Sequence, residues 1–229
     1  MPGKSSSWAA KVGAMLAKDI RQEYRTRYAA GAILLFGVTT VTVVSFTMGR
    51  LDLPVEAQAA VLWIIIFFAA MSGLAQSFIR EEETKTAVAL RLYADPNPVY
   101  VGKLIYNILI LALLVAVITP LYIIMTDMIV SGIGLFCLIL FLGIIGLAGA
   151  TTLIAAIISK ANIRGALFAV LSFPLLLPLL IGAIGGTAKT LSENEDYWAA
   201  ASSEIQLLIS YAVVVITAGI LLFEFVWEE

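Results

Sequence analysis

Six long stretches without a charged residue constrain this chain more than any other feature. Each has 19 to 32 residues, and together they cover residues 28–49, 57–79, 104–126, 128–159, 165–188 and 205–223. A helix needs about 20 apolar residues to cross a bilayer, so each stretch has the length of one span. The 32-residue stretch is too short for two crossings, and Gly132 and Gly134 near its start predict a short turn before one long helix. The sequence therefore predicts an all-α membrane protein with six transmembrane helices.

The composition leaves little room for a water-soluble domain. The chain has 229 residues, of which 61% are hydrophobic and 13% are charged, whereas soluble domains are roughly 45–50% apolar. We expect two regions: a cytoplasmic amphipathic helix within residues 1–27 and a six-span permease domain over residues 28–229.

The residues needed for several kinds of chemistry are missing from the sequence. There is no histidine, and Cys137 is the only cysteine, which excludes a histidine metal site, histidine-ligated haem and a Ser-His-Asp centre. Gly102-Lys103 lacks the first glycine and the Ser or Thr of a phosphate loop. We expect no enzymatic activity, no directly bound metal or cofactor and no nucleic-acid surface. Cys137 is expected to be a small buried hydrophobe.

The basic residues predict the orientation, because Lys and Arg near spans stay on the cytoplasmic side. Twelve of the 14 basic residues fall on one side of the predicted topology, which places both termini in the cytoplasm. The loops on the other side are acidic. The acids of the last of these loops, Glu193, Glu195, Asp196 and Glu204, are either solvated or meet a partner outside the cytoplasm.

The segment before the first span has the pattern of an amphipathic interfacial helix. Its apolar residues recur mostly at three- and four-residue steps: Trp8, Val12, Met15, Leu16, Ile20 and Tyr24. Basic residues occupy the other side and would face anionic lipid. The helix is either a plain membrane anchor or a connecting helix that also touches a cytoplasmic partner.

The long cytoplasmic loop 80–103 contains charged residues, an expected helix with one apolar side and two prolines that end this helix. An acidic run precedes a short amphipathic helix, and the helix ends at the prolines after Asp95. This arrangement fits a lever seated in a groove of a cytoplasmic protein; a solvated connector is the alternative. The lever would be formed by Arg80, Glu81, Glu82, Glu83, Thr86, Leu90, Arg91, Asp95 and Pro96.

Glycines and prolines mark features inside the spans. Small residues allow helices to approach closely in lipid, which assigns a packing role, within one subunit or between subunits, to Gly143, Gly146, Gly149, Gly182 and Gly186. Pro174 and Pro178 are expected to break or kink the fifth span and make it a candidate for movement, and Pro120 bends the third span more mildly. No stretch contains a charge, which counts against a proton- or sodium-coupled path.

Together these features resemble the ABC-2 type permeases, and more narrowly the haem exporter protein B family, CcmB, of cytochrome c maturation. The resemblance is most specific over 78–103, with its acid-rich run, leucine-rich helix and aromatic-x-Gly-Lys close, and over 171–183, with its Pro-x-x-x-Pro pattern. The sequence has Lys85-Thr86 where many relatives have Gly-Thr.

The resemblance implies a permease subunit in the inner membrane of a bacterium. Its expected partners are a cytoplasmic ABC ATPase that binds ATP, a second copy of the chain, a haem-binding membrane subunit, a small accessory subunit and membrane lipid. The subunit would couple ATP hydrolysis either to haem export or to release of a haem-loaded chaperone. The alternatives are an ABC-2 permease for a lipid, glycan or drug, and an ATP-independent secondary carrier.

Overall fold

The computed structural model describes residues 7–48, 53–74, 95–158, 164–192 and 196–228, and within these ranges all regular structure is helical. The helices are α1 (Trp8–Thr26), α2 (Tyr28–Met48), α3 (Val55–Leu74), α6 (Pro96–Thr126), α7 (Ile133–Ile158), α8 (Arg164–Leu191), α9 (Tyr197–Ala200) and α10 (Ser202–Glu228). Six of them, α2, α3, α6, α7, α8 and α10, are long and apolar enough to span a membrane. The prediction of six spans is confirmed.

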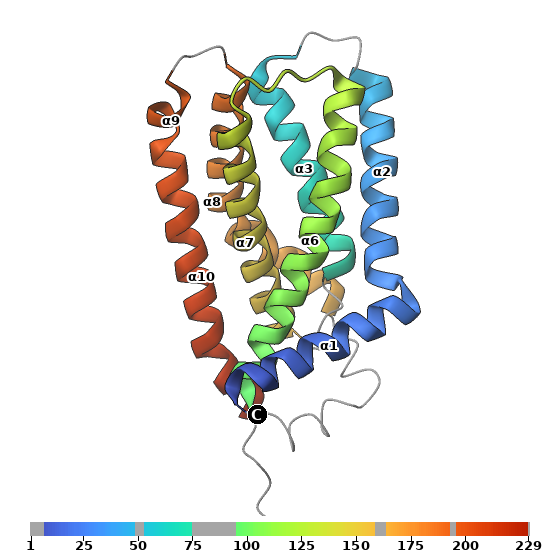
Figure 1. Ribbon diagram of the computed structural model, residues 1–229, viewed down its shortest axis with the longest axis vertical. Coiled ribbons are helices and arrows are strands. Elements are labelled where there is room, and N and C mark those ends of the chain that lie inside the picture. Colours follow the sequence, from blue (N-terminus) through green and yellow to red (C-terminus); the bar gives the residue numbers. More distant parts are fainter. Residues whose placement is uncertain (1–6, 49–52, 75–94, 159–163, 193–195, 229) are drawn as a thin grey trace, which may run out of the picture.

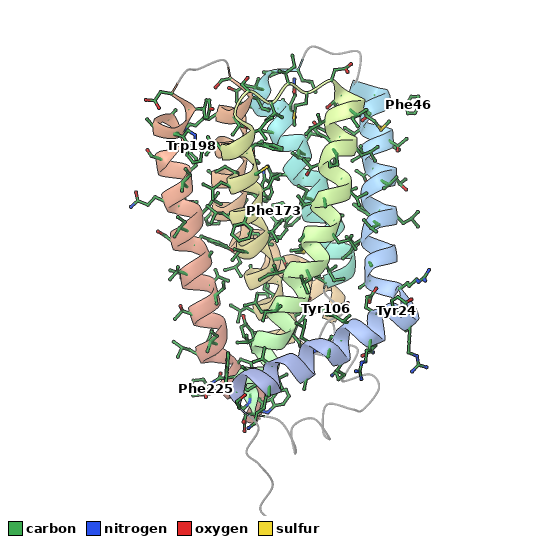
Figure 2. The ribbon with its side chains drawn as sticks, viewed as in Figure 1. Tyr24, Phe46, Tyr106, Phe173, Trp198 and Phe225 are labelled. Carbon is green, nitrogen blue, oxygen red and sulfur yellow. The ribbon has the colours of Figure 1, made fainter. Side chains whose placement is uncertain are left out.

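The six long helices form one bundle, and α1 crosses obliquely beneath one end of it (Figure 1). Helix α7 packs against α8 and α10, and α6 contacts α1, α2, α7 and α10. At the opposite end lies the short α9. Large apolar side chains such as Phe46 and Phe225 point outward from the bundle (Figure 2) and are 80% and 71% exposed. Such an apolar exterior is what a lipid-facing surface requires.

Helix boundaries follow local capping chemistry. The Ser7 hydroxyl accepts a hydrogen bond from the Ala10 amide at 3.3 Å and begins α1. Helix α6 begins with Pro96 directly after Asp95, because proline fits the first helical position, where no amide donor is needed. Residues 96–103 are therefore the first two turns of α6, so this helix begins within the segment 80–103 that was expected to be a loop.

Each of the five packing glycines lies against a side chain of its own chain. Gly143 faces the Trp63 ring of α3, and a Cβ atom at each of the other four would lie within 4 Å of a side chain of α7, α8 or α10. A Cβ atom at Gly146 would lie 2.6 Å from Leu179, and one at Gly186 would lie 2.7 Å from Ile139. A role of these glycines between subunits stays a prediction.

Of the break or kink expected at the two prolines of the fifth span, the break is wrong, and a kink stays a prediction. Helix α8 is continuous through Pro174 and Pro178, and both prolines are exposed on the outside of the bundle. A proline disturbs the carbonyls one turn before it, and the Leu175 carbonyl, three residues before Pro178, accepts a hydrogen bond from the Tyr211 hydroxyl of α10 at 2.9 Å. The N–H that Pro178 lacks would have bonded the Pro174 carbonyl, so the Tyr211 bond does not replace it; it ties α10 to α8 one residue further on. Helix α6 is likewise continuous through Pro120.

The expectation for the cysteine is also wrong. Cys137 is exposed on α7. Lipid is as apolar as a protein core, so a thiol in a span has no need to be inside the bundle.

Replacing Gly143 with Ala tests the glycine contacts. The new methyl group would overlap the Trp63 ring, which is 1% exposed and held by a 2.9 Å hydrogen bond from its Nε1 to the Thr187 hydroxyl. We expect G143A to lower the free energy of unfolding by about 1–3 kcal/mol, measured by denaturation in detergent.

Gly31→Ala is the matched control, since a Cβ at Gly31 of α2 meets nothing within 4 Å. Its helix propensity predicts a gain of up to about 1 kcal/mol. Equal stability of G143A and G31A would contradict the packing role.

Candidate functional site at the joint between α1 and α6

The beginning of α6 is the most polar buried part of the described structure. A helix of 31 residues is about 46 Å long, whereas the hydrocarbon core is about 30 Å thick. One end of α6 therefore reaches past the core, and at its first turns it is crossed by α1 (Figure 1). Of the residues assigned to the lever, those from Arg80 to Arg91 lie outside the described residues, while Asp95 and Pro96 begin α6.

Asp95 joins the start of α6 to α1. Its side chain makes no capping hydrogen bond to α6 and instead pairs with the Lys11 ammonium. Both side chains are largely exposed, and such pairs contribute little stability. The pair nevertheless places the first residue after the undescribed segment against α1.

A buried ion pair lies two turns further along α6. Lys103 is 1% exposed, and its Nζ lies 3.6 Å from Asp19 Oδ2 on α1. The other carboxylate oxygen of Asp19 lies 3.6 Å from Nζ of Lys18, whose side chain is exposed. An isolated buried charge costs several kcal/mol, so Lys103 requires a carboxylate beside it. This requirement determines where α1 crosses α6.

Glu23 holds three helices together with one carboxylate. On α1 it is 9% exposed; its Oε1 accepts the Ala30 amide in the first turn of α2 at 2.8 Å, and its Oε2 accepts the Tyr106 hydroxyl of α6 at 3.0 Å. Figure 2 shows Tyr106 where α6 passes α1. A carboxylate is also favourable at the positive N-terminal end of α2. Glu23 therefore fixes the bend between α1 and α2 at residues 23–30, which we call the elbow.

The backbone of the elbow agrees with this role. Helix α1 ends at Thr26, and its C-cap Arg27 is left-handed with φ 50° and donates its amide to the Glu23 carbonyl at 2.6 Å. Helix α2 begins at the next residue. The two helices are thus joined by a single residue outside helical geometry, so the direction of α1 relative to the first span is set locally.

Close packing completes the contact between α1 and α6. A Cβ atom at Gly102 would lie 2.9 Å from the Cβ of Met15, which is 6% exposed. The glycine lets the two helix backbones approach. Deeper in the bundle, Asn107 of α6 donates to the Thr152 hydroxyl of α7 at 2.8 Å, and both residues are fully buried.

The C-terminal end of α10 also contacts these first turns of α6. Asn97 donates to Glu224 Oε1 at 3.2 Å. The Tyr100 hydroxyl lies directly over Gly219, and its ring centroid is 5.3 Å from that of Phe223. The first turns of α6 are therefore held by α1 through charges and by α10 through an amide and aromatic contacts.

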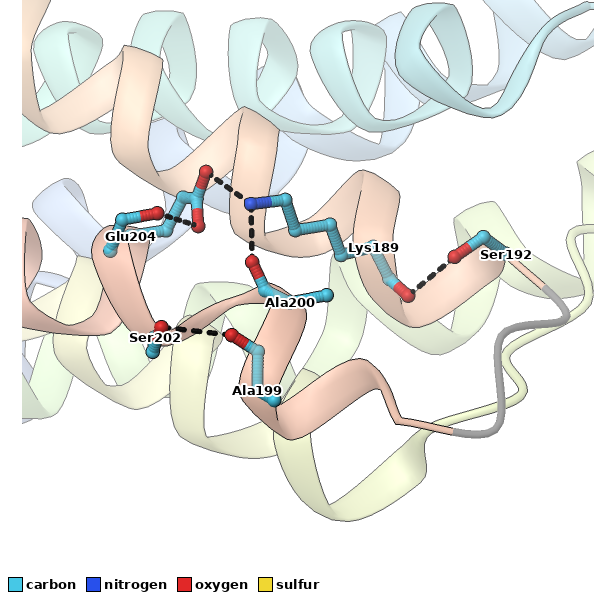
Figure 3. A network of polar contacts seen from close by, with 7 residues as sticks. Lys189, Ser192, Ala199, Ala200, Ser202 and Glu204 are labelled. Atoms are coloured by element: carbon cyan, nitrogen blue, oxygen red, sulfur yellow. Dashed lines mark hydrogen bonds and ion pairs between the residues drawn. The ribbon is translucent and has the colours of Figure 1, made fainter.

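The opposite end of the bundle has a smaller polar network (Figure 3). Lys189 of α8 donates to Glu204 Oε1 of α10 and to the Ala200 carbonyl, both at 2.6 Å. Ser203 donates to the other oxygen of Glu204 at 2.9 Å. Of the acids predicted to be solvated or to meet a partner, Glu204 is bound within the chain. This network ties α8 to α10.

Sequence reasoning missed the acids of α1. It predicted one apolar stripe from Trp8 to Tyr24, but the inward face is formed by Val12, Met15, Asp19 and Glu23, while Ile20 and Tyr24 are 45% and 77% exposed. The available signal was the four-residue spacing of the two acids, which continues the Val12–Met15 side of the helix. Among the described residues, no group of three potential metal ligands occurs.

The sequence profile of the CcmB protein family matches residues 10–224, nearly the whole chain. The chain belongs to the CcmB family. No curated protein matches the chain.

Membership makes the chain a membrane component of a haem exporter ABC system and a permease subunit of a transporter, with a place in cytochrome c maturation. Six apolar helices agree with a multi-pass membrane protein. Association with other subunits of that system, such as an ATPase, follows at the level of the family. The joint between α1 and α6 lies inside the matched region.

A double-mutant cycle on Glu23 and Tyr106 tests the elbow. Tyr106→Phe removes a hydrogen bond to a charged acceptor, so we expect a loss of about 1.5–3 kcal/mol of unfolding free energy. Combined with Glu23→Gln, the loss should be smaller than the sum of the two single losses, because Gln offers one uncharged oxygen in place of two charged ones and both variants therefore weaken the same bond.

Tyr24→Phe is the control, since Tyr24 lies on the same helix as Glu23 with its ring exposed. We expect a change within about 0.5 kcal/mol. Additive effects of E23Q and Y106F, or an equal loss in Y24F, would show that the elbow bond contributes nothing.

Proposed function

We propose that this CcmB family member transmits ATP-driven movement of a separate cytoplasmic ABC ATPase to the membrane part of the haem-handling complex. In this proposal both termini and the α1 end of the bundle face the cytoplasm of a bacterium, and the complex lies in its inner membrane. ATP binds the ATPase, and haem binds a partner membrane subunit. A small accessory subunit and a second copy of the chain complete the assembly.

One observation carries the proposal: the first turns of α6 are held by two other helices, α1 and α10. Residues 80–94 would be moved by the ATPase, and Asp95 follows them directly. From Asp95 onward the chain is a continuous helix held by Lys11 and Asp19 of α1 and by Glu224 of α10. A displacement at Asp95 therefore passes to α6, and through its contacts to α1 and α10.

The work done is proposed to be mechanical, namely release of a haem-loaded chaperone from the partner subunit. The spans supply no histidine for the iron. Among the described charges of the long helices, Lys103 is occupied by Asp19, and Lys189 is occupied by Glu204. These cations are engaged within the chain and are not displayed for a haem propionate.

A flux assay distinguishes this role from passage of haem. Vesicles that contain only the chain and its ATPase should carry no haem across the membrane when ATP is added. ATP-dependent haem uptake by such vesicles would contradict the mechanical role and favour export through this subunit.

Charge reversal in the loop tests the coupling itself. We expect the triple variant E82K/E83K/R91E to lose the co-purifying ATPase, because charged contacts set pairing and register at such an interface. Membrane insertion should be unchanged. The measurement is the ATPase-to-permease ratio after affinity purification of the intact complex.

Reversal at the other end of the bundle is the control. Glu56 lies in the first turn of α3, and Asp196 directly precedes α9, both at the end of the bundle away from α1 (Figure 1). The variant E56K/D196K should retain the ATPase. Full recruitment by the triple variant, or its loss in E56K/D196K, would overturn the assignment of the lever and of the cytoplasmic end.

A further inference from the structure

Helix α10 is the least buried of the six spans. In its membrane-spanning part, 22% of the residues are buried, the smallest share among the six. The helix lies at the edge of the bundle (Figure 1), and apolar side chains such as Val213 and Leu221 are each 60% exposed. Lipid and protein suit such side chains equally well, so the apolar residues alone do not indicate what covers α10.

Polar side chains interrupt the outward side of α10 at regular steps. Gln206, Ser210 and Thr217 are exposed, and together with Val213 they follow one another at steps of four, three and four residues. Residues at such steps lie along one side of a helix. We call these four residues the α10 stripe.

The three polar residues of the α10 stripe form no hydrogen bond with any residue that the structure describes. Three threonines of α2 show how a hydroxyl can be satisfied in lipid, because Thr40, Thr42 and Thr47 each donate to the carbonyl four residues earlier. A polar group without a partner is costly in an apolar environment, and Ser, Thr and Gln of spans bond across to other helices. The α10 stripe is therefore better suited to a polar helix of another polypeptide than to lipid.

The charge at the C-terminal end of α10 indicates which polypeptide fits. Residues 202–229 contain four acids and no Lys or Arg. Glu224 lies seven residues after Thr217, is exposed, and bonds the uncharged Asn97 while making no ion pair within the described part of the chain. Two parallel copies of α10 would bring like charges together, which is unfavourable. A different helix with Lys or Arg at its cytoplasmic end, where such residues concentrate, would be attracted.

Helix α10 also adjoins the site where movement would enter the bundle. Asn97 of α6 bonds Glu224, and the ring of Tyr100 lies 5.3 Å from that of Phe223 between centroids. A shift of the first turns of α6 would therefore reach α10 directly. A membrane partner seated on the outward side of α10 would be displaced with it.

We propose that the α10 stripe docks a transmembrane helix of the partner membrane subunit. This helix carries Ser, Thr, Asn or Gln on its facing side and Lys or Arg at its cytoplasmic end, and it exchanges hydrogen bonds with Gln206, Ser210 and Thr217. The inference rests on the proposed function, which supplies the orientation and the membrane partner. Its tests measure the membrane partner and not the ATPase, so the two can fail separately.

The first test removes the hydrogen-bonding groups with little change in shape. The intact complex is purified through Gln206→Leu/Ser210→Ala/Thr217→Val, and the retained membrane partner is quantified by mass spectrometry over a dilution series. Apparent affinity for this partner should fall about 2.7-fold for each lost hydrogen bond, or about 20-fold in total. The ATPase-to-permease ratio should stay unchanged.

Thr39→Val is the matched control, because Thr39 is exposed on a different span, α2. It should retain the membrane partner as the unaltered chain does. Unfolding midpoints check that each variant is folded.

The second test identifies what lies against α10. Benzoylphenylalanine is placed in the intact complex in place of Ser210 or, as the control, in place of Thr39. Ultraviolet light should link position 210, and not position 39, to the membrane partner. Sequencing of the linked peptide should place the link in a transmembrane segment with the polar and basic residues described above.

Four results would overturn the proposal. Links from position 210 to a second copy of the chain would assign the α10 stripe to a dimer contact. Absence of a link to another polypeptide would leave the α10 stripe facing lipid. Equal retention by Q206L/S210A/T217V and T39V would show that the polar groups do not recognise the partner. Loss of the ATPase together with the membrane partner would indicate a general defect of assembly.

Discussion

The buried charge of Lys103 is the constraint on which the arrangement of this chain depends. An ammonium group at 1% exposure near the end of a membrane span requires a carboxylate within a few ångströms, and Asp19 of α1 supplies it. Once Asp19 is in place, Glu23 lies one turn further along α1 and reaches both α6 and the first turn of α2. The path of α1, the elbow and the start of the first span are thus linked through two carboxylates.

This linkage has a consequence for force transmission. Helix α6 extends as one piece from Asp95 to the far end of the bundle, and its first turns are gripped by α1 and α10. A force applied at Asp95 acts directly on α6, because no flexible segment lies between Asp95 and the helix.

The spans could be predicted because bilayer thickness alone sets their length. Charge-free stretches locate all six spans, but they mark the part of each helix that crosses the hydrocarbon core and not the whole helix. Helix α6 begins at Pro96, eight residues before its charge-free stretch, because Asp95 at the N-cap position and not hydropathy decides where the helix starts. The five glycines were found for a similar reason, since a missing side chain is visible in sequence and has few uses inside a span.

The joint could not be predicted in the same way. A charged residue on an amphipathic helix is interpreted as solvent-facing, and the partners of Asp19 and Glu23 on α6 lie more than 80 residues away in the sequence. The break expected at the prolines of α8 is absent, because proline costs a backbone hydrogen bond only locally and the helix continues through both residues. The contacts that decide the path of α1 are tertiary.

The most direct test of the account is whether α1 and the first turns of α6 move as one body. Met15 and Gly102 lie close enough for a disulfide after a small shift, so we would oxidise M15C/G102C in a C137A background and measure ATP turnover of the reconstituted complex. The account predicts equal turnover in oxidised and reduced protein; turnover that stops on oxidation and returns on reduction would contradict it.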